Sequence, residues 1–196
     1  DMINWMALQG QTEEISHAVQ SLSRFYKLTL SRKKGISTIS RELEHVTLYV
    51  QLQNMRYHDS IELITDIPDE LSEYQIPKLT LQPVVENSIL HGFEGRENGG
   101  MIRIKGGIDG SRFRLSIEDN GCGMSRETEE PMQQILEEKH TLDLAGTGIG
   151  IQNVVTRLRM YYGEKLSIML ESAPGEGTKF TFWLPIPENP EQEIEE

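Results

Sequence analysis

The sequence predicts an α+β sandwich, in which helices cover one face of a largely antiparallel sheet, preceded by an antiparallel helical hairpin. Three observations lead to this prediction. Apolar residues recur with helical spacing through about the first 57 residues, and later segments alternate apolar and polar residues as half-buried strands do. The strands are also joined by hairpin turns and intermixed with helices, which is typical of an α+β arrangement.

Two amphipathic segments, Glu13–Leu30 and Ile39–Tyr57, form the expected hairpin. Gly35 follows a basic run and ends the first helix, while Ser37 or Thr38 is the candidate N-cap of the second. A hairpin this narrow cannot bury both of its faces alone. We therefore expect a dimeric four-helix bundle, with packing of both helices on the following domain as the alternative. The apolar positions with helical spacing in the first segment are Ile15, Val19, Leu22 and Tyr26.

The pattern changes to mixed strands and helices from about residue 60. Asp109 and Gly110 join two alternating segments and form a strong hairpin signal, and Pro83 fits only the first turn of a helix. The segment 124–145 is polar and irregular, with one short possible helix. The expected strands are Ile61–Ile67, Met101–Ile108, Arg112–Glu118, Lys165–Glu171 and Lys179–Leu184, and the expected helices are Leu81–His91 and Ile149–Tyr162.

Composition limits the classes of function. The 196 residues carry a formal net charge of −12, which disfavours nucleic acid as a partner, so any phosphate ligand needs a local site. No apolar run reaches the roughly 20 residues that span a bilayer, and we expect no membrane contact by this chain. Cys122 is the sole cysteine, which excludes an internal disulfide and a Cys-based zinc site. We expect three regions: a hairpin at 1–59, a domain at 60–187 and an acidic, disordered tail at 188–196.

The first chemically unusual cluster lies in the segment LTLQPVVENSILHG. Glu86 and Asn87 interrupt an otherwise core-like helix, and His91 shares a face with Asn87 because the two are four residues apart. An Asn carbonyl oxygen is a suitable Mg²⁺ ligand, and a neighbouring carboxylate can orient or deprotonate a nucleophile. The alternative interpretation is an exposed helix edge with ordinary solvated side chains.

The second cluster, Asp119–Gly123, follows a predicted buried strand. Its Asn-Gly pair alone is ordinary turn chemistry. An Asp and two glycines directly after a buried strand are more than a tight turn needs, however. Glycines permit close approach of a flat ligand, and the carboxylate of Asp119 can accept a hydrogen bond from an exocyclic amine. The pattern therefore leaves two interpretations open, a ligand site and a simple turn.

The third cluster, Gly146–Gly150, opens a predicted helix and has the spacing Gly-x-Gly-x-Gly. Backbone N–H groups at a glycine-rich helix N-terminus bind anions, and the helix dipole favours phosphate there. The cluster is not a Walker motif, because no Gly-Lys-Ser/Thr follows. It is not a dinucleotide fingerprint either, because the spacing differs and no βαβ unit surrounds it. The alternative interpretation is a flexible hinge.

The three clusters in this order resemble the N, G1 and G2 boxes of the GHKL ATPase superfamily, and Gly175–Thr178 is similar to a further glycine–threonine element on the adenine side. Within that superfamily, the closer resemblance is to the LytS/YesM-like sensor histidine kinases. The segments that carry it are LQPVVENSILHG, DNGCGM, GTGIGIQNVVTRL, GEGT and, upstream, ELEHVTLYVQLQNMRY. The resemblance implies a Bergerat-type ATP-binding domain and an ATP-dependent protein histidine kinase of a two-component system.

The resemblance also implies roles for individual residues. Glu86 would polarise the attacking group, Asn87 would coordinate Mg²⁺, and Asp119 would bind the adenine amine with the help of Thr178. The segment 124–145 would form a lid over the nucleotide, and ATP and Mg²⁺ would be the cofactors. The residues expected to line the ATP pocket are Asn87, His91, Asp119, Gly121, Gly123, Met124, Gly146, Thr147, Gly148, Ile149, Gly150 and Thr178.

The implied partners are a second copy of the parent protein, which would make it a homodimer, and a response regulator. The resemblance further implies that the parent is a membrane-anchored bacterial sensor and that this part of it is cytoplasmic. We expect a longer parent because the chain lacks an initiator Met and begins within a helical pattern.

The sequence departs from the family at the phosphoacceptor. The family's acceptor histidine lies in a motif similar to N-P-H-F-L-Y-N on the first helix of the hairpin, and no such motif occurs here. His17 and His45 lack those neighbours, so we expect neither to be phosphorylated and the acceptor to lie upstream. Two alternative functions remain at this point: a non-catalytic nucleotide-sensing module and another GHKL ATPase.

Overall fold

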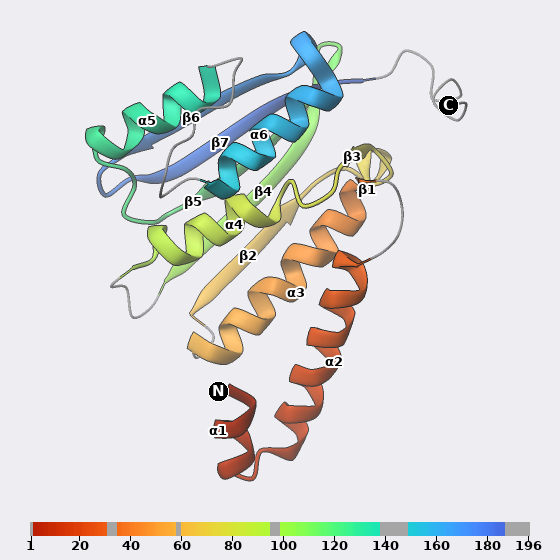
Figure 1. Cartoon of the computed structure of the whole chain (residues 1–196), viewed down its shortest axis with the longest axis vertical. Coiled ribbons are helices and arrows are strands. Elements are labelled where there is room, and N and C mark those ends of the chain that lie inside the picture. Colours follow the sequence, from red (N-terminus) through yellow and green to blue (C-terminus); the bar gives the residue numbers. More distant parts are fainter. Residues whose placement is uncertain (1, 31–34, 58–59, 95–98, 138–148, 187–196) are drawn as a thin grey trace.

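The computed structural model describes residues 2–30, 35–57, 60–94, 99–137 and 149–186. Figure 1 shows a five-stranded sheet with helices on one face and a helical hairpin that extends away from the sheet. In these residues, no helix is both long enough and apolar enough to cross a bilayer. The arrangement confirms the predicted α+β sandwich with a preceding hairpin.

The sheet is mixed and comprises β2 (Ile61–Asp66), β4 (Gly100–Asp109), β5 (Arg112–Asp119), β6 (Ser167–Ala173) and β7 (Gly177–Pro185). Its strand order is β2-β4-β5-β7-β6, in which β2 and β4 are parallel and the other neighbours are antiparallel. The register sets Asp119, at the end of β5, opposite Ile102 of β4 and Thr178 of β7. This register brings the second predicted cluster and the glycine–threonine element together.

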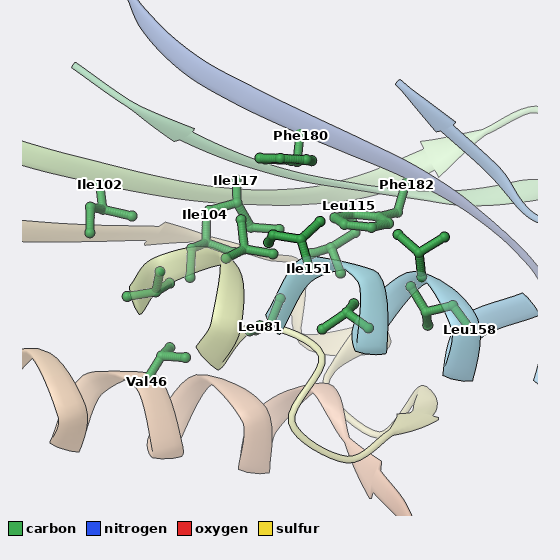
Figure 2. Packing of buried hydrophobic residues seen from close by; sticks show 14 of the residues in the cluster. Val46, Leu81, Ile102, Ile104, Leu115, Ile117, Ile151, Leu158, Phe180 and Phe182 are labelled. Atoms are coloured by element: carbon green, nitrogen blue, oxygen red, sulfur yellow. The ribbon is translucent and has the colours of Figure 1, made fainter. Parts of the chain in front are cut away.

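One hydrophobic core lies between the sheet and its helices (Figure 2). The alternation of β5 points Phe113, Leu115 and Ile117 toward the helices, where none is more than 1% exposed. Burial of one such side chain contributes roughly 1.5–3 kcal/mol. The helices that contribute to this core are α3 (Ile39–Tyr57), α4 (Gln82–Asn87), α5 (Arg126–Glu137) and α6 (Ile149–Tyr162).

The hairpin consists of α2 (Thr12–Thr29) and α3, and is preceded by the short helix α1 (Met2–Leu8). The helix α3 packs on the domain that follows, because Ile39, Val46 and Val50 belong to the core. By contrast, α2 packs on α3 and leaves Val19 and Tyr26 exposed. The alternative in which both helices pack on the following domain therefore holds for the second helix only. The region boundary at residue 59 stays a prediction.

A two-stranded sheet, which the sequence did not predict, fastens the hairpin turn to the domain. Its strands β1 (Ile36–Thr38) and β3 (Gln75–Pro77) pair antiparallel, so the proposed helix caps at Ser37 and Thr38 lie in a strand. The turn Asp69–Leu71 is a 3₁₀ helix between β2 and β3. Both ends of α3 are thus held against the sheet domain. One end is held by the pairing of β1, and the other by Asn54, whose side chain donates to the Ile61 oxygen and accepts from the Ile61 N–H.

Two further segments differ from the prediction. The segment 124–145 was expected to be irregular apart from one short possible helix around Met132, Ile135 and Leu136. That helix is present as α5 but is longer, with twelve residues, and the three apolar side chains are buried. The remainder of that segment, 138–145, lies outside the described residues. The strand expected at Lys165–Glu171 instead begins at Ser167, because Gly163–Lys165 form a 3₁₀ turn after α6.

Candidate functional site

The carboxylate of Asp119 forms the centre of the candidate site. It lies at the end of β5 and is only 6% exposed. The Ser88 hydroxyl donates to Oδ2 at 2.6 Å, and the Gly121 and Thr178 backbone N–H groups donate to Oδ1 at 2.8 and 3.2 Å. Two carboxylate oxygens offer about four lone-pair positions, so one more donor can still be accommodated. Asp119 is therefore a rigidly oriented acceptor, as recognition of an amine requires.

The glycines around Asp119 are needed for contact between backbone segments. A Cβ atom on Gly121 would lie 2.6 Å from the Gly92 carbonyl oxygen, and one on Gly123 would lie 1.9 Å from the Ala173 oxygen. Gly123 also has a φ of +67°, which few residues other than glycine adopt. The sequence suggested that these glycines admit a flat ligand. The structure assigns them first to packing the turn 119–123 against its two neighbours.

Backbone hydrogen bonds complete that packing. The Cys122 N–H donates to the Gly92 oxygen at 2.7 Å, and the Cys122 carbonyl accepts from the Gly175 N–H at 2.7 Å. The turn after β5 is thereby tied both to the end of the first cluster and to the turn before β7. Cys122 itself is exposed, and its thiol lies 3.3 and 3.4 Å from the carbonyl oxygens of His91 and Gly123.

Three polar residues of the site were not singled out from the sequence: Ser88, Asn120 and Ser172. The Asn120 side chain accepts from the Met101 N–H and donates to the Gly99 oxygen, each at 2.8 Å. The Ser172 hydroxyl lies 2.9 Å from the Met124 N–H and 3.0 Å from the Thr178 hydroxyl. Thr178 therefore contacts Asp119 through its backbone, and its side chain turns toward Ser172.

The first cluster spans a change of helix type. After α4, residues Ser88–Gly92 form a π-helical turn, and such turns occur frequently at functional sites. Glu86 and Asn87 are half-buried at the end of α4, whereas His91 is exposed on the π turn. Among the described residues, no hydrogen bond occupies the side-chain oxygens of Glu86 or Asn87. These oxygens are thus available to a ligand.

The third cluster is described only in part, because Gly146, Thr147 and Gly148 lie outside the described residues. Ile149 and Gly150 form the exposed beginning of α6. A Cβ atom on Gly150 would lie 3.4 Å from the Pro83 side chain, an ordinary contact that places the beginning of α6 beside the beginning of α4. The helix start predicted to bind phosphate thus neighbours the helix that carries Asn87.

Two histidines of the hairpin differ in environment. His45 is 3% exposed, stacks on Phe25 with ring centroids 4.4 Å apart, and lies 2.8 Å from the Thr29 hydroxyl. His17 is exposed on α2. Burial lowers the pKa of His45, although the nearby Glu44 charge opposes the shift. A buried, packed imidazole is a poor phosphoacceptor, which agrees with the expectation for His45.

Comparison with known proteins identifies the family. Residues 75–188 match the family described as histidine kinase-, DNA gyrase B-, and HSP90-like ATPase, and residues 1–61 match the family described as histidine kinase. Sensor histidine kinase YesM of Bacillus subtilis is 32% identical over 185 residues, which are 94% of this chain and 30% of the relative. Sensor histidine kinase BtsS of Escherichia coli is 32% identical over 178 residues, covering 91% of this chain and 29% of the relative. The chain thus spans about 30% of the length of these relatives.

A solved structure agrees with this family at the level of the fold. The histidine kinase domain of a blue-light activated histidine kinase from Erythrobacter litoralis superposes with a TM-score of 0.54 at 16% identity, covering 94% of this chain and 82% of that domain. This likeness confirms the predicted Bergerat-type fold. The chain therefore belongs to the family of histidine kinase-, DNA gyrase B-, and HSP90-like ATPases.

Proposed function

We propose that this chain binds Mg²⁺–ATP and supplies the catalytic part of a kinase that phosphorylates a histidine of its own parent protein. In that reaction a histidine nitrogen attacks the γ-phosphorus, the bond between that phosphorus and the β–γ bridging oxygen breaks, and ADP leaves. The observation that carries the proposal is the buried carboxylate of Asp119, which three donors hold in place with capacity for one more. The exocyclic amine of adenine is a donor of the right kind.

Asn87 and Glu86 are proposed to act at the phosphate end of the nucleotide. Asn87 offers an amide oxygen at the end of α4, and the described residues include no group of three or more His, Cys, Asp or Glu side chains suited to a metal ion. This donor set fits Mg²⁺, which is commonly held by one or two protein oxygens together with phosphate oxygens and water. When bound, Mg²⁺ would neutralise charge on the phosphates. Glu86 would orient the attacking histidine and accept its proton.

The glycines of the third cluster and the beginning of α6 are proposed to embrace the phosphates. Gly146, Thr147, Gly148, Ile149 and Gly150 would present backbone N–H groups at the positive end of the α6 dipole. His91, exposed on the π turn, would lie near the same phosphates. On the adenine side, Gly121, Gly123, Met124 and Thr178 would complete the pocket around Asp119.

The segment 124–145 is proposed to act as a lid over the nucleotide. Its described part, α5, is attached to α6 through Arg159, whose guanidinium donates to the carbonyl oxygens of Ile135 and Leu136 at the end of α5. These bonds fix the end of α5 to α6, because the carbonyl groups of a final helical turn otherwise lack partners.

The exposed apolar side chains of α2 support a homodimer of the parent protein. Val19 and Tyr26 of α2 are 49% and 55% exposed, and Leu30, directly after the helix, is 74% exposed, although α2 already packs on α3. A second copy would bury these side chains in a four-helix bundle. A response regulator would receive the phosphate, and the domain would form the cytoplasmic part of a membrane-anchored bacterial sensor, as the sensor histidine kinase relatives suggest.

Phosphotransfer in the parent protein tests this proposal. Incubation with γ-labelled ATP and Mg²⁺ is expected to give acid-labile, base-stable phosphohistidine on the parent. Asn87→Ala is expected to abolish that signal, while Asn87→Asp, which retains an oxygen ligand, restores part of it. The 196-residue chain alone is expected to remain unlabelled and to bind ATP. Strong acid-labile labelling of the chain alone, or full labelling of the Asn87→Ala parent, contradicts the proposal.

A further inference from the structure

A buried carboxylate of the hairpin holds the loop that leads into α4. Glu42, in the first turn of α3, is 3% exposed. Its Oε1 accepts from the Leu79 N–H at 3.0 Å, and its Oε2 accepts from the Thr80 and Leu81 N–H groups at 2.8 and 3.3 Å. Three consecutive backbone donors therefore converge on one side chain 37 to 39 residues away in the sequence.

The held loop contains a strained residue. Leu79 has a φ of +58°, and among the described residues it is the single non-glycine residue with positive φ. Its carbonyl oxygen accepts a 2.8 Å hydrogen bond from the Arg157 guanidinium of α6. Both peptide groups of Leu79 are thus held, one from α3 and one from α6. Such strain persists only where the surroundings fix it, and it concentrates at functional sites.

The charge of Glu42 favours the charged form of Arg157 across this loop. Burial raises the pKa of Glu42, and the three backbone N–H groups and the Ser37 hydroxyl oppose that shift. Burial also lowers the pKa of Arg157, and the charge of Glu42 opposes that shift. Separating α3 from the loop would leave the buried carboxylate of Glu42 without its N–H donors, which costs free energy. The two segments therefore move together.

The loop connects directly to both phosphate-side elements of the nucleotide site. Leu81 is the residue immediately before α4, a helix of six residues that ends at Asn87. Arg157 lies on α6, whose first turn contains Gly150, in contact with Pro83 of α4. In so short a helix, a displacement of the first residue is transmitted to the last. The position of Asn87 therefore depends on the contact between Glu42 and the loop.

We propose that Glu42 is a positioning residue of the nucleotide site, which sets α4, and hence Asn87 and Glu86, relative to the helical hairpin. The loop 79–81, clasped between Glu42 and Arg157, links the position of α3 to the geometry of the phosphate side. This inference rests on the proposed function in that it takes Asn87 as a ligand of the bound nucleotide. It adds a route by which a change in the hairpin alters nucleotide binding without any contact between α3 and the nucleotide.

A comparison of Glu42→Gln with Asn54→Ala in the 196-residue chain tests the proposal. Asn54 also lies on α3 and joins it to the sheet domain, with hydrogen bonds of 2.7 and 3.0 Å to Ile61, but it does not touch the loop 79–81. Glu42→Gln replaces one acceptor oxygen by an amide NH₂ group, which would face N–H donors. The measurements are Tm, the Kd of a fluorescent ATP analogue well below both melting temperatures, and amide hydrogen exchange of residues 82–92 without nucleotide.

Glu42→Gln is expected to raise the Kd at least fivefold and to speed exchange in residues 82–92. Arg157→Met should have the same two effects. The Kd of the double variant should not exceed that of the weaker-binding single variant, because both substitutions act through Leu79. Asn54→Ala should lower Tm while leaving the Kd within twofold of wild type. Wild-type Kd and exchange in Glu42→Gln, or an equal loss of affinity in Asn54→Ala, would overturn the proposal. If the wild-type chain binds no nucleotide while Glu42→Gln still loosens residues 82–92, the proposed function fails and the positioning role of Glu42 stands.

Discussion

The Ser88 hydroxyl donates a 2.6 Å hydrogen bond to Oδ2 of Asp119, and this bond joins the π turn after α4 to the end of β5. Both residues are buried, at 4% and 6% exposure. The bond links the proposed phosphate-binding helix to the proposed adenine-binding carboxylate. It also leaves Oδ1 to the Gly121 and Thr178 N–H groups. The two ends of the pocket are therefore parts of one hydrogen-bonded unit.

Ser88→Ala is expected to weaken ATP binding about tenfold, because a hydrogen bond to a charged group contributes about 1.5–3 kcal/mol and 1.4 kcal/mol corresponds to tenfold in affinity. The Kd of a fluorescent ATP analogue measures this effect. Ser111→Ala is the matched control, since Ser111 is exposed in the turn between β4 and β5. An unchanged Kd in Ser88→Ala would show that the orientation of Asp119 does not depend on this bond.

Asn87→Ala is expected to weaken ATP binding in the presence of Mg²⁺ and to have little effect when Mg²⁺ is removed with EDTA. The reason is that the lost group is an oxygen ligand of the ion, and the adenine contacts remain. Titrations of ATP with and without Mg²⁺, for wild type and variant, measure this difference. Equal losses under both conditions would place Asn87 in contact with the nucleotide itself and would remove it as a metal ligand.

Gly177→Ala and Gly175→Ala separate two roles of glycine in the turn before β7. Both residues have positive φ, +86° and +82°, and substitution costs about 1–2 kcal/mol for this reason alone. A Cβ atom on Gly177 would also lie 2.0 Å from the Asp119 carbonyl oxygen, whereas one on Gly175 meets nothing within 4 Å. Denaturant unfolding is therefore expected to show a loss of about 3 kcal/mol or more for Gly177→Ala and of about 1–2 kcal/mol for Gly175→Ala. Equal losses of stability in the two variants would contradict the close approach of Gly177, at the start of β7, to Asp119, at the end of β5.

The order of the three glycine and polar clusters allowed the site to be predicted from the sequence, but the contacts within it were not predictable. Asp119 and Asn87 were predicted as site residues because their residue types and spacing suit an amine and a metal ion. Ser172, by contrast, reaches Met124 across 48 residues, and nothing in its own neighbourhood in the sequence signals that contact. In the sequence, nothing distinguishes Ser88 from an ordinary helical serine. Its contact with Asp119, 31 residues away, is formed only by the tertiary structure.

The same limit applies to the fold. Long periodic segments such as α2 and α6 were predicted to within one or two residues, because their apolar faces have a clear period. The strands β1 and β3 have three residues each, too few to show alternation. The helix α5 was underestimated because its sequence is mostly polar and includes Pro131, and only its buried face follows the helical period. The π turn after α4 leaves no periodic signal at all.

The stability of the chain is expected to decrease as pH falls below about 6.5, partly through His45. Burial lowers the pKa of His45 below its usual value, so the unfolded chain binds this proton more readily than the folded one. The stability that His45 contributes is therefore present above the unfolded pKa and is lost as pH falls toward the lowered folded pKa. The Thr29 hydroxyl donates to the Phe25 oxygen, so it accepts from His45 Nε2.

His45→Gln tests this prediction, since a Gln amide can still donate to Thr29 and does not titrate. The decrease in Tm between pH 8 and pH 5.5 is expected to be smaller in this variant than in wild type. His17→Gln, at an exposed position on α2, is the matched control and should retain the wild-type pH dependence. Identical pH profiles for wild type and His45→Gln would contradict the prediction.

The most direct test of the nucleotide site is calorimetric titration of ATP into the wild-type chain, Asp119→Asn and Glu118→Gln. Glu118 is the neighbouring residue on β5, with an exposed side chain that alternates to the other face of the sheet. One ATP site is expected in wild type and in Glu118→Gln. In Asp119→Asn we expect at least tenfold weaker binding, because an uncharged amide oxygen accepts a weaker hydrogen bond from the adenine amine than a carboxylate does. ATP binding of wild-type strength in Asp119→Asn, or none in wild type, would contradict the account.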